Sequence, residues 1–201
     1  MIHLNGNILC VIDCETTGLD PLMHSIWQFT CLPLDFRLDP HSEIGVFDVQ
    51  LQPTTEHYDS KALSRSKFAE AMTQGLAAEV GANLFHEWFE RLPLGFKKRI
   101  MVLAHNWPFD REFIRNWLGD ASFDYYFDPR YRDTMALAAA LNDVCDVHAN
   151  RVPFNKHTLR GIANILEVEW DDLSAHNSLY DANKTAQVYK KLVHTAEFIW
   201  E

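Results

Sequence analysis

The feature that most constrains the fold is a pair of short apolar runs, each followed directly by polar and acidic residues. The first is Asn-Ile-Leu-Cys-Val-Ile-Asp at residues 7–13, and the second is Arg-Ile-Met-Val-Leu-Ala at residues 99–104. Runs of this length that are rich in branched aliphatic residues are typical of strands buried on both faces. The sequence therefore predicts two central strands in a sheet that helices cover.

The segments around these runs predict the other elements. Residues 25–35 and 44–51 are expected to form two further strands, with a turn at residues 39–41 between them. Together with the first run they make an antiparallel meander, and residues 123–132 are expected to contain a short strand. Helical patterns cover residues 60–92, 108–118, 133–141, 158–166 and 178–193.

Strands followed by alternating helices and strands predict an α/β fold with a mixed sheet of about five strands flanked by helices. The antiparallel meander comes first in this sheet, and parallel strands follow. Because the sequence of 201 residues shows no internal repeat and no linker, we expect residues 1–201 to form a single domain.

Composition narrows the class of protein. Hydrophobic residues make up 47% of the chain and charged residues 23%, which is typical of a globular protein. No apolar run approaches the ~20 residues of a membrane span, and the start shows no secretory signal. The cysteines at positions 10, 14, 31 and 145 are scattered and follow no metal-binding spacing. We expect a cytoplasmic protein with reduced thiols, no membrane contact and no zinc site.

The sharpest local motif is Asp13-Cys14-Glu15-Thr16-Thr17-Gly18, directly after the first strand. Side chains two positions apart on an extended chain point to the same side, so Asp13 and Glu15 converge while Cys14 turns away. Converging carboxylates are costly unless a cation or hydrogen bonds compensate their charge. A polar turn after a strand is the simpler interpretation, and it would be favoured if the motif stood alone.

Two more acidic residues stand at the starts of predicted helices. Asp110 follows the second central strand and, alone, would be interpreted as a carboxylate that complements a helix dipole. Asp181 heads a core-facing stripe with Thr185, Val188 and Leu192 at helical spacing. A charge on such a stripe needs a partner, and a cation shared with the other carboxylates fits. Oxygen ligands without a cysteine cluster favour Mg²⁺ or Mn²⁺.

In this order the motifs resemble those of the DEDDh exonucleases, the DnaQ-like branch of the RNase H-like fold. The family's D-x-E motif matches residues 13–15, and T-T-G follows at residues 16–18. The second motif matches residues 106–110, and the third, H-x4-D, matches His176 and Asp181. All five catalytic positions of the family carry permitted residue types, and the motifs span almost the whole chain.

The resemblance implies a 3′→5′ exonuclease with two bound ions, Mg²⁺ or Mn²⁺, that releases nucleoside 5′-monophosphates. Asp13, Glu15 and Asp181 would hold one ion. Asp13 would bridge to the second ion, and Asp110 would assist through coordinated water. Two ions about 4 Å apart activate the attacking water and stabilise the leaving 3′ oxygen. His176 would be the general base, because a reference pKa of about 6.5 suits proton abstraction near neutral pH.

The resemblance also implies where the nucleic acid binds. In the family, the backbone of the turn after D-x-E contacts the terminal nucleotide, and an apolar residue after it packs on a base. Phe109 is interpreted either as a base-stacking residue or, equally, as part of the core. The candidate substrate-binding residues are Thr16, Thr17, Gly18, Leu19, Asn106 and Phe109. His105 and His157 are interpreted as structural residues.

The net charge of −10 bears on the substrate. Tight binding to a long duplex draws on many phosphate contacts, so we expect binding to the 3′ end of a single strand instead. DNA and RNA both remain candidates, because discrimination depends on contacts to the 2′-hydroxyl.

A stand-alone exonuclease is the leading hypothesis. A proofreading subunit bound to a polymerase and a non-catalytic nucleic-acid-binding module of the same fold are the alternatives, and the complete set of five residues disfavours the second of these. The sequence does not choose between a polymerase and a second copy of the chain as a partner. It also assigns no role to residues 52–87 and 120–132.

Overall fold

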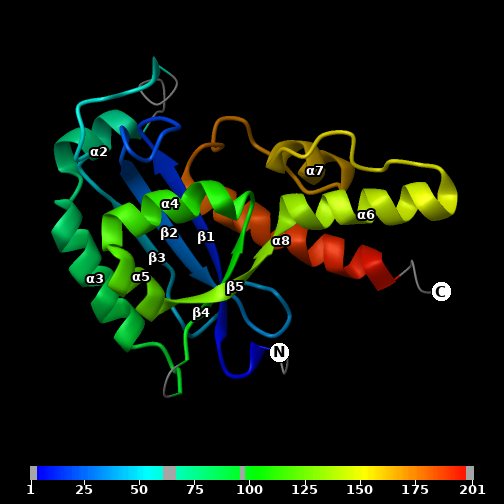
Figure 1. The fold of residues 1–201 in the computed structure, drawn as a ribbon, viewed down its shortest axis with the longest axis horizontal. Coiled ribbons are helices and arrows are strands. Elements are labelled where there is room, and N and C mark those ends of the chain that lie inside the picture. The colour runs from blue at the N-terminus through cyan, green and yellow to red at the C-terminus, as the bar shows by residue number, and fades with distance from the viewer. Residues whose placement is uncertain (1–3, 61–66, 96–97, 198–201) are drawn as a thin grey trace.

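A computed structural model describes residues 4–60, 67–95 and 98–197 of the chain. A five-stranded mixed sheet forms its centre, with the strands in the order β3-β2-β1-β4-β5 (Figure 1). The strands are β1 (Ile8–Thr16), β2 (Ile26–Pro33), β3 (Phe47–Gln50), β4 (Ile100–Ala104) and β5 (Phe127–Asp133). β1, β2 and β3 form an antiparallel meander, whereas β4 pairs in parallel with both β1 and β5. The predicted sheet is confirmed.

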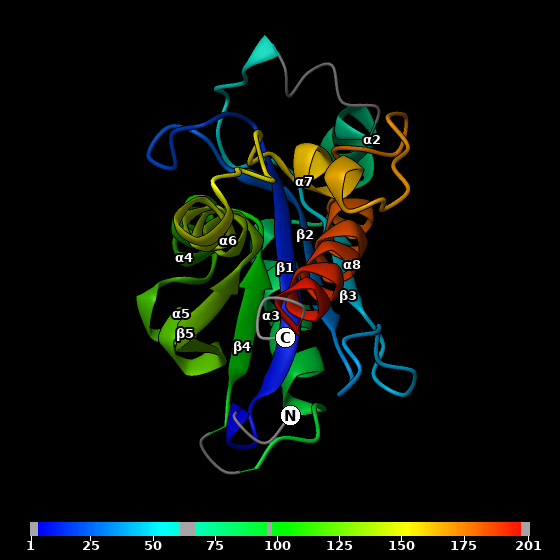
Figure 2. The same cartoon turned by 90° about the vertical axis from the view of Figure 1, so that its right-hand side faces the viewer.

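Helices cover both faces of this sheet. Those in the described residues are α2 (Phe68–Gln74), α3 (Ala78–Glu90), α4 (Trp107–Leu118), α5 (Asp120–Tyr126), α6 (Thr134–Ala149), α7 (Leu159–Ile165) and α8 (Ser178–Glu197). α3, α4 and α5 pack on one face, and α8 crosses the other (Figure 2). α6 and α7 pack against α8. Across the described ranges, no helix combines the length and the apolar character needed to cross a membrane.

Four helices differ most from the sequence prediction. The helix expected at residues 60–92 is divided between α2 and α3, because Leu76 forms a parallel bridge with Leu51; residues 61–66 of that prediction lie outside the described residues. α5 precedes β5 where no helix was predicted, and it buries Phe123 and Tyr126. α6 continues beyond residue 141 to Ala149.

Alternation along β1 decides which side chains face which helices. Cys10, Ile12 and Cys14 belong to the core beneath α3, α4 and α5. Leu9 and Val11 belong to the core beneath α8. Asp13 and Glu15 continue this second set, because side chains two positions apart share a face of the sheet. The carboxylates of β1 therefore lie on the side of the sheet that α8 covers.

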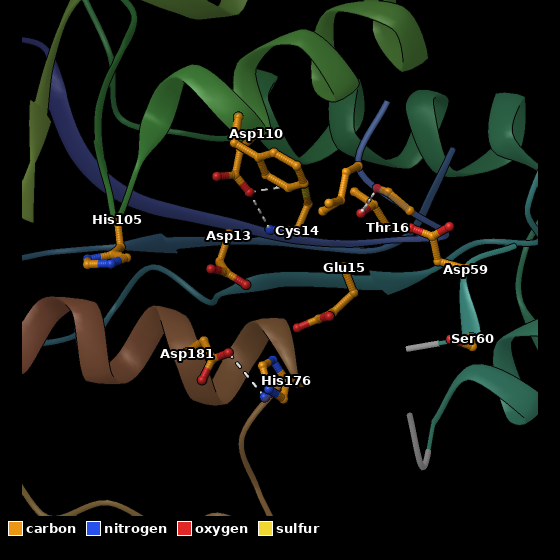
Figure 3. Close-up of a pocket in the computed structure, with 13 residues that line it drawn as sticks. Asp13, Cys14, Glu15, Thr16, Asp59, Ser60, His105, Asp110, His176 and Asp181 are labelled. Carbon is orange, nitrogen blue, oxygen red and sulfur yellow. Dashed lines mark hydrogen bonds between the residues drawn. The ribbon is translucent and has the colours of Figure 1, made fainter. Parts of the chain in front are cut away.

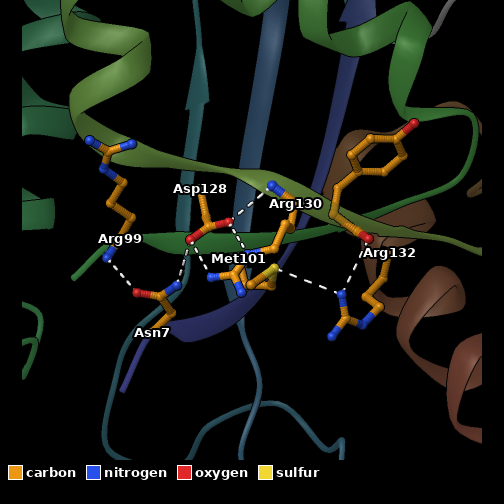
Figure 4. A network of polar contacts seen from close by, with 7 residues as sticks. Asn7, Arg99, Met101, Asp128, Arg130 and Arg132 are labelled. Carbon is orange, nitrogen blue, oxygen red and sulfur yellow. Dashed lines mark hydrogen bonds and ion pairs between the residues drawn. The ribbon is translucent and has the colours of Figure 1, made fainter. Parts of the chain in front are cut away.

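The opposite end of the sheet is joined by a polar network around Asn7 (Figure 4). Asn7 donates from Nδ2 to Asp128 Oδ2 at 2.8 Å and accepts from the Arg99 backbone N–H at 3.0 Å. The side chain of Arg130 pairs with Asp128 at 2.9 Å and lowers the pKa of that carboxyl to about 2. Asn7 thereby connects the segments at the starts of β1, β4 and β5, far from the end where the acidic motif lies.

Candidate active site

A single pocket at the carboxyl end of β1 collects the predicted acidic residues and the predicted histidine (Figure 3). Its volume is about 440 Å³, and Asp13, Glu15, Asp110, His176 and Asp181 all line it. The other lining residues are Cys14, Thr16, Gly18, Leu19, Asp59, Ser60, His105 and Phe109. Segments far apart in the sequence therefore meet at one place, as the three motifs predict.

The carboxylate of Asp13 lies among the other acidic residues of the pocket. Burial raises its pKa well above the usual range, and the negative charges of Asp110, Asp181 and Glu15 raise it further. Burial and like charges both disfavour the ionised form, whereas a bound cation favours it. The electrostatics of the pocket therefore suit a positively charged ligand.

Asp110 reaches the pocket from the other face of the sheet. The pairing of β1 with β4 ends at Val11 and Leu103, beyond which the chain turns into α4. The Cys14 backbone N–H beyond this point donates to Asp110 Oδ1 at 3.1 Å, and the Cys14 thiol donates to the same oxygen at 3.0 Å. Burial raises the pKa of Asp110 to about 7, although the hydrogen bonds from Cys14 oppose this rise. Cys14 thus orients Asp110, while its own side chain lies on the face opposite Asp13, as alternation predicts.

His176 and Asp181 stand at the beginning of α8. His176 has a left-handed backbone conformation with φ of 63°, and its backbone N–H donates to Asp181 Oδ2 at 3.1 Å. Glu15, His176 and Asp181 each place one potential ligand atom within 4.8 Å of the other two. This spacing suits a shared metal ion.

The carboxylate of Asp133, at the end of β5, joins the starts of two helices. Its oxygens accept the backbone N–H groups of Asn106 at 3.2 Å and Trp107 at 2.8 Å, where α4 begins. They also accept those of Met135 at 2.9 Å and Ala136 at 3.2 Å, where α6 begins. Because Asp110 lies in the first turn of α4, this carboxylate helps to place it. Sequence reasoning did not identify Asp133.

The predicted substrate-binding residues do not all reach the pocket. Thr16, Gly18 and Leu19 line it, and Leu19 is 75% exposed. Thr17 is fully buried, and its hydroxyl accepts the Ser25 backbone N–H at 3.1 Å, so its side chain supports the turn from behind. The turn leaves little space at Gly18, because an added Cβ would lie 2.3 Å from the ring of His24 and that ring would have to move.

In the second motif, residues 106–110, some of the predicted residues also line the pocket and others do not. Phe109 lines the pocket and packs on Phe113 with ring centroids 5.1 Å apart, so it is part of the core and also has a surface in the pocket. Asn106 is not among the lining residues. Its backbone, with φ of 69°, starts α4.

Besides Cys14, three pocket residues were not predicted as site residues. His105, interpreted from the sequence as structural, lines the pocket and also lies 2.8 Å from the Thr134 hydroxyl through Nδ1; burial lowers its pKa. Asp59 and Ser60 reach the rim because the Asp59 backbone N–H donates to the Thr17 carbonyl at 2.7 Å. No spacing in the sequence connects this segment with the acidic motif.

Comparison with known proteins identifies the family. The exonuclease family model RNase_T matches residues 10–189. The PolC-type DNA polymerase III of Mycoplasmopsis pulmonis is 25% identical over 188 residues, which cover 89% of this chain but 11% of that polymerase. Ribonuclease T of Wigglesworthia glossinidia brevipalpis is 24% identical over 191 residues, which cover 92% of this chain and 83% of that protein.

Solved structures share the fold. A complex of E. coli exonuclease I with single-stranded DNA superposes with a TM-score of 0.73 at 17% identity, covering 96% of this chain and 42% of that one. The nuclease domain of 3′hExo, a DEDDh family member bound to rAMP, superposes with a TM-score of 0.68 at 16% identity, covering 94% and 92%. Because the family model spans nearly the whole sequence, this chain belongs to the exonuclease family, and it has the RNase H-like fold of the solved DEDDh exonucleases.

Proposed function

We propose that this chain is a metal-dependent 3′→5′ exonuclease that acts on single-stranded nucleic acid and releases nucleoside 5′-monophosphates. The observation that carries the proposal is the meeting of four carboxylates and His176 in one pocket at the end of β1. Membership of the exonuclease family supports the reaction class. The single-stranded DNA in the exonuclease I structure supports the substrate class.

The pocket residues fit Mg²⁺ or Mn²⁺. The donors are carboxylate oxygens, which these ions prefer, and burial raises the pKa values of Asp13 and Asp110, so a bound cation would favour their ionised forms. In the proposed site, Asp13, Glu15 and Asp181 would hold one ion, and Asp13 together with Asp110 would help to hold a second. When bound, two ions activate the attacking water and stabilise charge on the leaving 3′ oxygen.

His176 is the proposed general base. Its side chain is exposed to the pocket, and one of its ring nitrogens lies close to Glu15 and Asp181. The hydrogen bond from its backbone to Asp181 fixes where the ring enters the pocket. A ring nitrogen in this position can accept the proton that the attacking water loses.

Two apolar residues that line the pocket, the exposed Leu19 and the partly buried Phe109, are the proposed contacts for the terminal nucleotides. Leu19 and Phe109 line the pocket and offer surfaces on which a base can pack. The turn at residues 16–18 lies beside Glu15, and Thr16 and Gly18 line the pocket in which the terminal nucleotide would bind. Contacts of this kind accept any base, which suits an enzyme that shortens a strand step by step.

The test is digestion of matched DNA and RNA oligonucleotides, single- and double-stranded, labelled at either the 5′ or the 3′ end. With Mg²⁺ and a 5′ label, a descending ladder is expected that EDTA abolishes, and mononucleotides should appear with the 3′ label. Asp13→Ala should remain folded and inactive. An intact single strand at high protein concentration would refute the proposal, and a ladder only from the 3′ label would reverse the polarity.

A second candidate is proofreading beside a polymerase. It is favoured by the PolC-type polymerases, which match 89% of this chain. Copurification of the chain with a polymerase, and faster removal of a mismatched 3′ nucleotide in that complex, would support it. Equal rates with and without the polymerase would refute it.

Two broader expectations also remain proposals. One is that residues 1–201 form a single exonuclease domain. The other is a cytoplasmic location, which the scattered free cysteines support.

A further inference from the structure

A row of buried polar side chains lies on β2 beneath the start of α8. Gln28 and Thr30 are both 0% exposed. Strand pairing places Gln28 opposite Glu15 and Thr30 opposite Asp13, so the row is directly beside the carboxylates of β1. Buried amides and hydroxyls require hydrogen-bond partners, and the partners show what such residues hold in place.

Asp48 on β3 sets the direction of these hydrogen bonds. Its Oδ1 accepts from Gln28 Nε2 at 3.1 Å and from the Thr30 hydroxyl at 2.8 Å. Thr30 has only one hydroxyl proton, so in its 2.7 Å contact with the Ser178 hydroxyl it must be the acceptor. With its amide nitrogen turned to Asp48, Gln28 presents its oxygen to α8. Asp48 therefore orients both side chains as acceptors for the helix start.

The acceptors on β2 bind the first residues of α8. Gln28 Oε1 accepts from Asn177 Nδ2 at 3.2 Å and from the Ser178 backbone N–H at 3.4 Å. Asn177 Oδ1 accepts the Tyr180 backbone N–H at 3.2 Å, which caps the helix. Both ends of the Asn177 amide are thus engaged, one by the sheet and one by the helix. Gln28 and Thr30 together hold Ser178 through its backbone and its hydroxyl.

This attachment lies between the two pocket residues at the start of α8, His176 and Asp181. His176 immediately precedes Asn177, and Asp181 lies in the first turn. We propose that Gln28 is a positioning residue: oriented by Asp48, it sets how His176 and Asp181 approach the carboxylates of β1. The catalytic part of this inference rests on the proposed function, whereas the structural part does not.

Gln28→Met tests the inference, because methionine keeps the length of the side chain and removes its amide. Asn7→Leu is the matched control. Asn7 also donates to an aspartate, Asp128, and also accepts a backbone N–H, that of Arg99, but at the opposite end of the sheet (Figure 4). Both variants lose the hydrogen bonds of one amide, so both should lower the unfolding temperature.

The first readout is hydrogen exchange of residues 175–181 in the metal-free protein, measured by mass spectrometry. Gln28→Met should accelerate exchange in this segment about tenfold or more, because the start of α8 opens more often. Asn7→Leu should leave it unchanged. Equal exchange in Gln28→Met and wild type would overturn the inference, whatever the activity.

The second readout is steady-state cleavage. Gln28→Met should lower kcat about tenfold or more and leave KM within about twofold, because substrate-binding surfaces are untouched. In a His176→Ala background it should add little, since residues that act together are non-additive. Full additivity, or an unchanged kcat, would overturn the catalytic part. If the wild type cleaves nothing, the proposed function fails, and the exchange measurement still decides the structural part.

A charge exchange provides the rescue. Gln28→Glu alone places a carboxylate against Asp48 and should impair kcat. Combined with Asp48→Asn, it gives position 48 an amide donor for that carboxylate and an oxygen for Thr30. The double variant should recover most of the lost kcat. A double variant as slow as Gln28→Glu would contradict the assigned directions.

Discussion

Asp110→Asn removes one charge from the pocket with little change in shape. Asp110 is 5% exposed, and its Oδ1 accepts both the backbone N–H and the thiol of Cys14. The oxygen of an asparagine can accept the same two hydrogen bonds. The substitution therefore isolates the free energy that the buried carboxylate costs the metal-free protein.

The magnitude follows from the pKa. Burial raises the pKa of Asp110 from 3.8 to about 7. At about 1.36 kcal/mol per pKa unit, ionisation destabilises the folded state by about 4 kcal/mol above pH 7. Below about pH 3 the carboxyl is protonated in both states and costs nothing. As the pH rises, the unfolded chain releases its proton first, so the advantage of Asp110→Asn should grow from about 2 kcal/mol at pH 5 to about 4 kcal/mol at pH 8.

Denaturant unfolding in EDTA at pH 5 and pH 8 measures this difference. Asp128→Asn is the control with the opposite sign, because Arg130 lowers the pKa of Asp128 to about 2. That stabilisation is complete above pH 4 and is lost only as the pH falls towards 2, so this variant should be less stable by the same amount at both pH values. If Asp110→Asn is no more stable than wild type at pH 8, or if its advantage does not grow with pH, the reasoning is wrong.

Three further outcomes are expected. His176→Ala should lower kcat about 10²–10⁴-fold with little change in substrate affinity, and steady-state kinetics with an unchanged kcat would remove it from the mechanism. Mn²⁺ should raise the unfolding temperature of the wild type by mass action but not that of Asp13→Ala, and equal shifts in a thermal scan would place the ion elsewhere. Leu19→Ala should raise KM several-fold through loss of about 1 kcal/mol of base packing, with kcat preserved; an unchanged KM would exclude the contact.

Most of the fold could be predicted because the strands of the sheet have recognisable patterns in the local sequence. The apolar runs of β1 and β4 and the meander of β2 and β3 follow from periodicity over a few residues. α5 could not be predicted in this way. Its start is held by pairs from Arg115 to Asp120 at 2.9 Å and to Asp124 at 3.3 Å, and it is buried by contacts of Phe123 and Tyr126 with other elements. Contacts of this kind override local propensity.

In the pocket too, residues that act through partners distant in sequence could not be predicted. Its acidic residues are found from short motifs, each of which spans only a few positions. Gln28 and Asp133 carry no such signal, because each acts through partners that are distant in sequence: Gln28 and Asn177 are separated by 149 positions. Thr17 is the opposite case. The motif includes it, but in the fold its hydroxyl accepts the Ser25 backbone N–H and does not line the pocket.

The pocket holds its carboxylates together although burial and like charges disfavour their ionised forms, and several parts of the fold fix them. Asp13 and Glu15 belong to β1, which pairs with β2 along residues 10–16 and with β4 along residues 8–11. Asp110 is fixed by Cys14 and, through the start of α4, by Asp133. Asp181 is carried on α8, whose start is bound to β2. Because these attachments are hydrogen bonds within the protein, we expect the pocket to keep its shape in EDTA. The extra stability of Asp110→Asn under those conditions then measures what burial of that carboxylate costs the folded state.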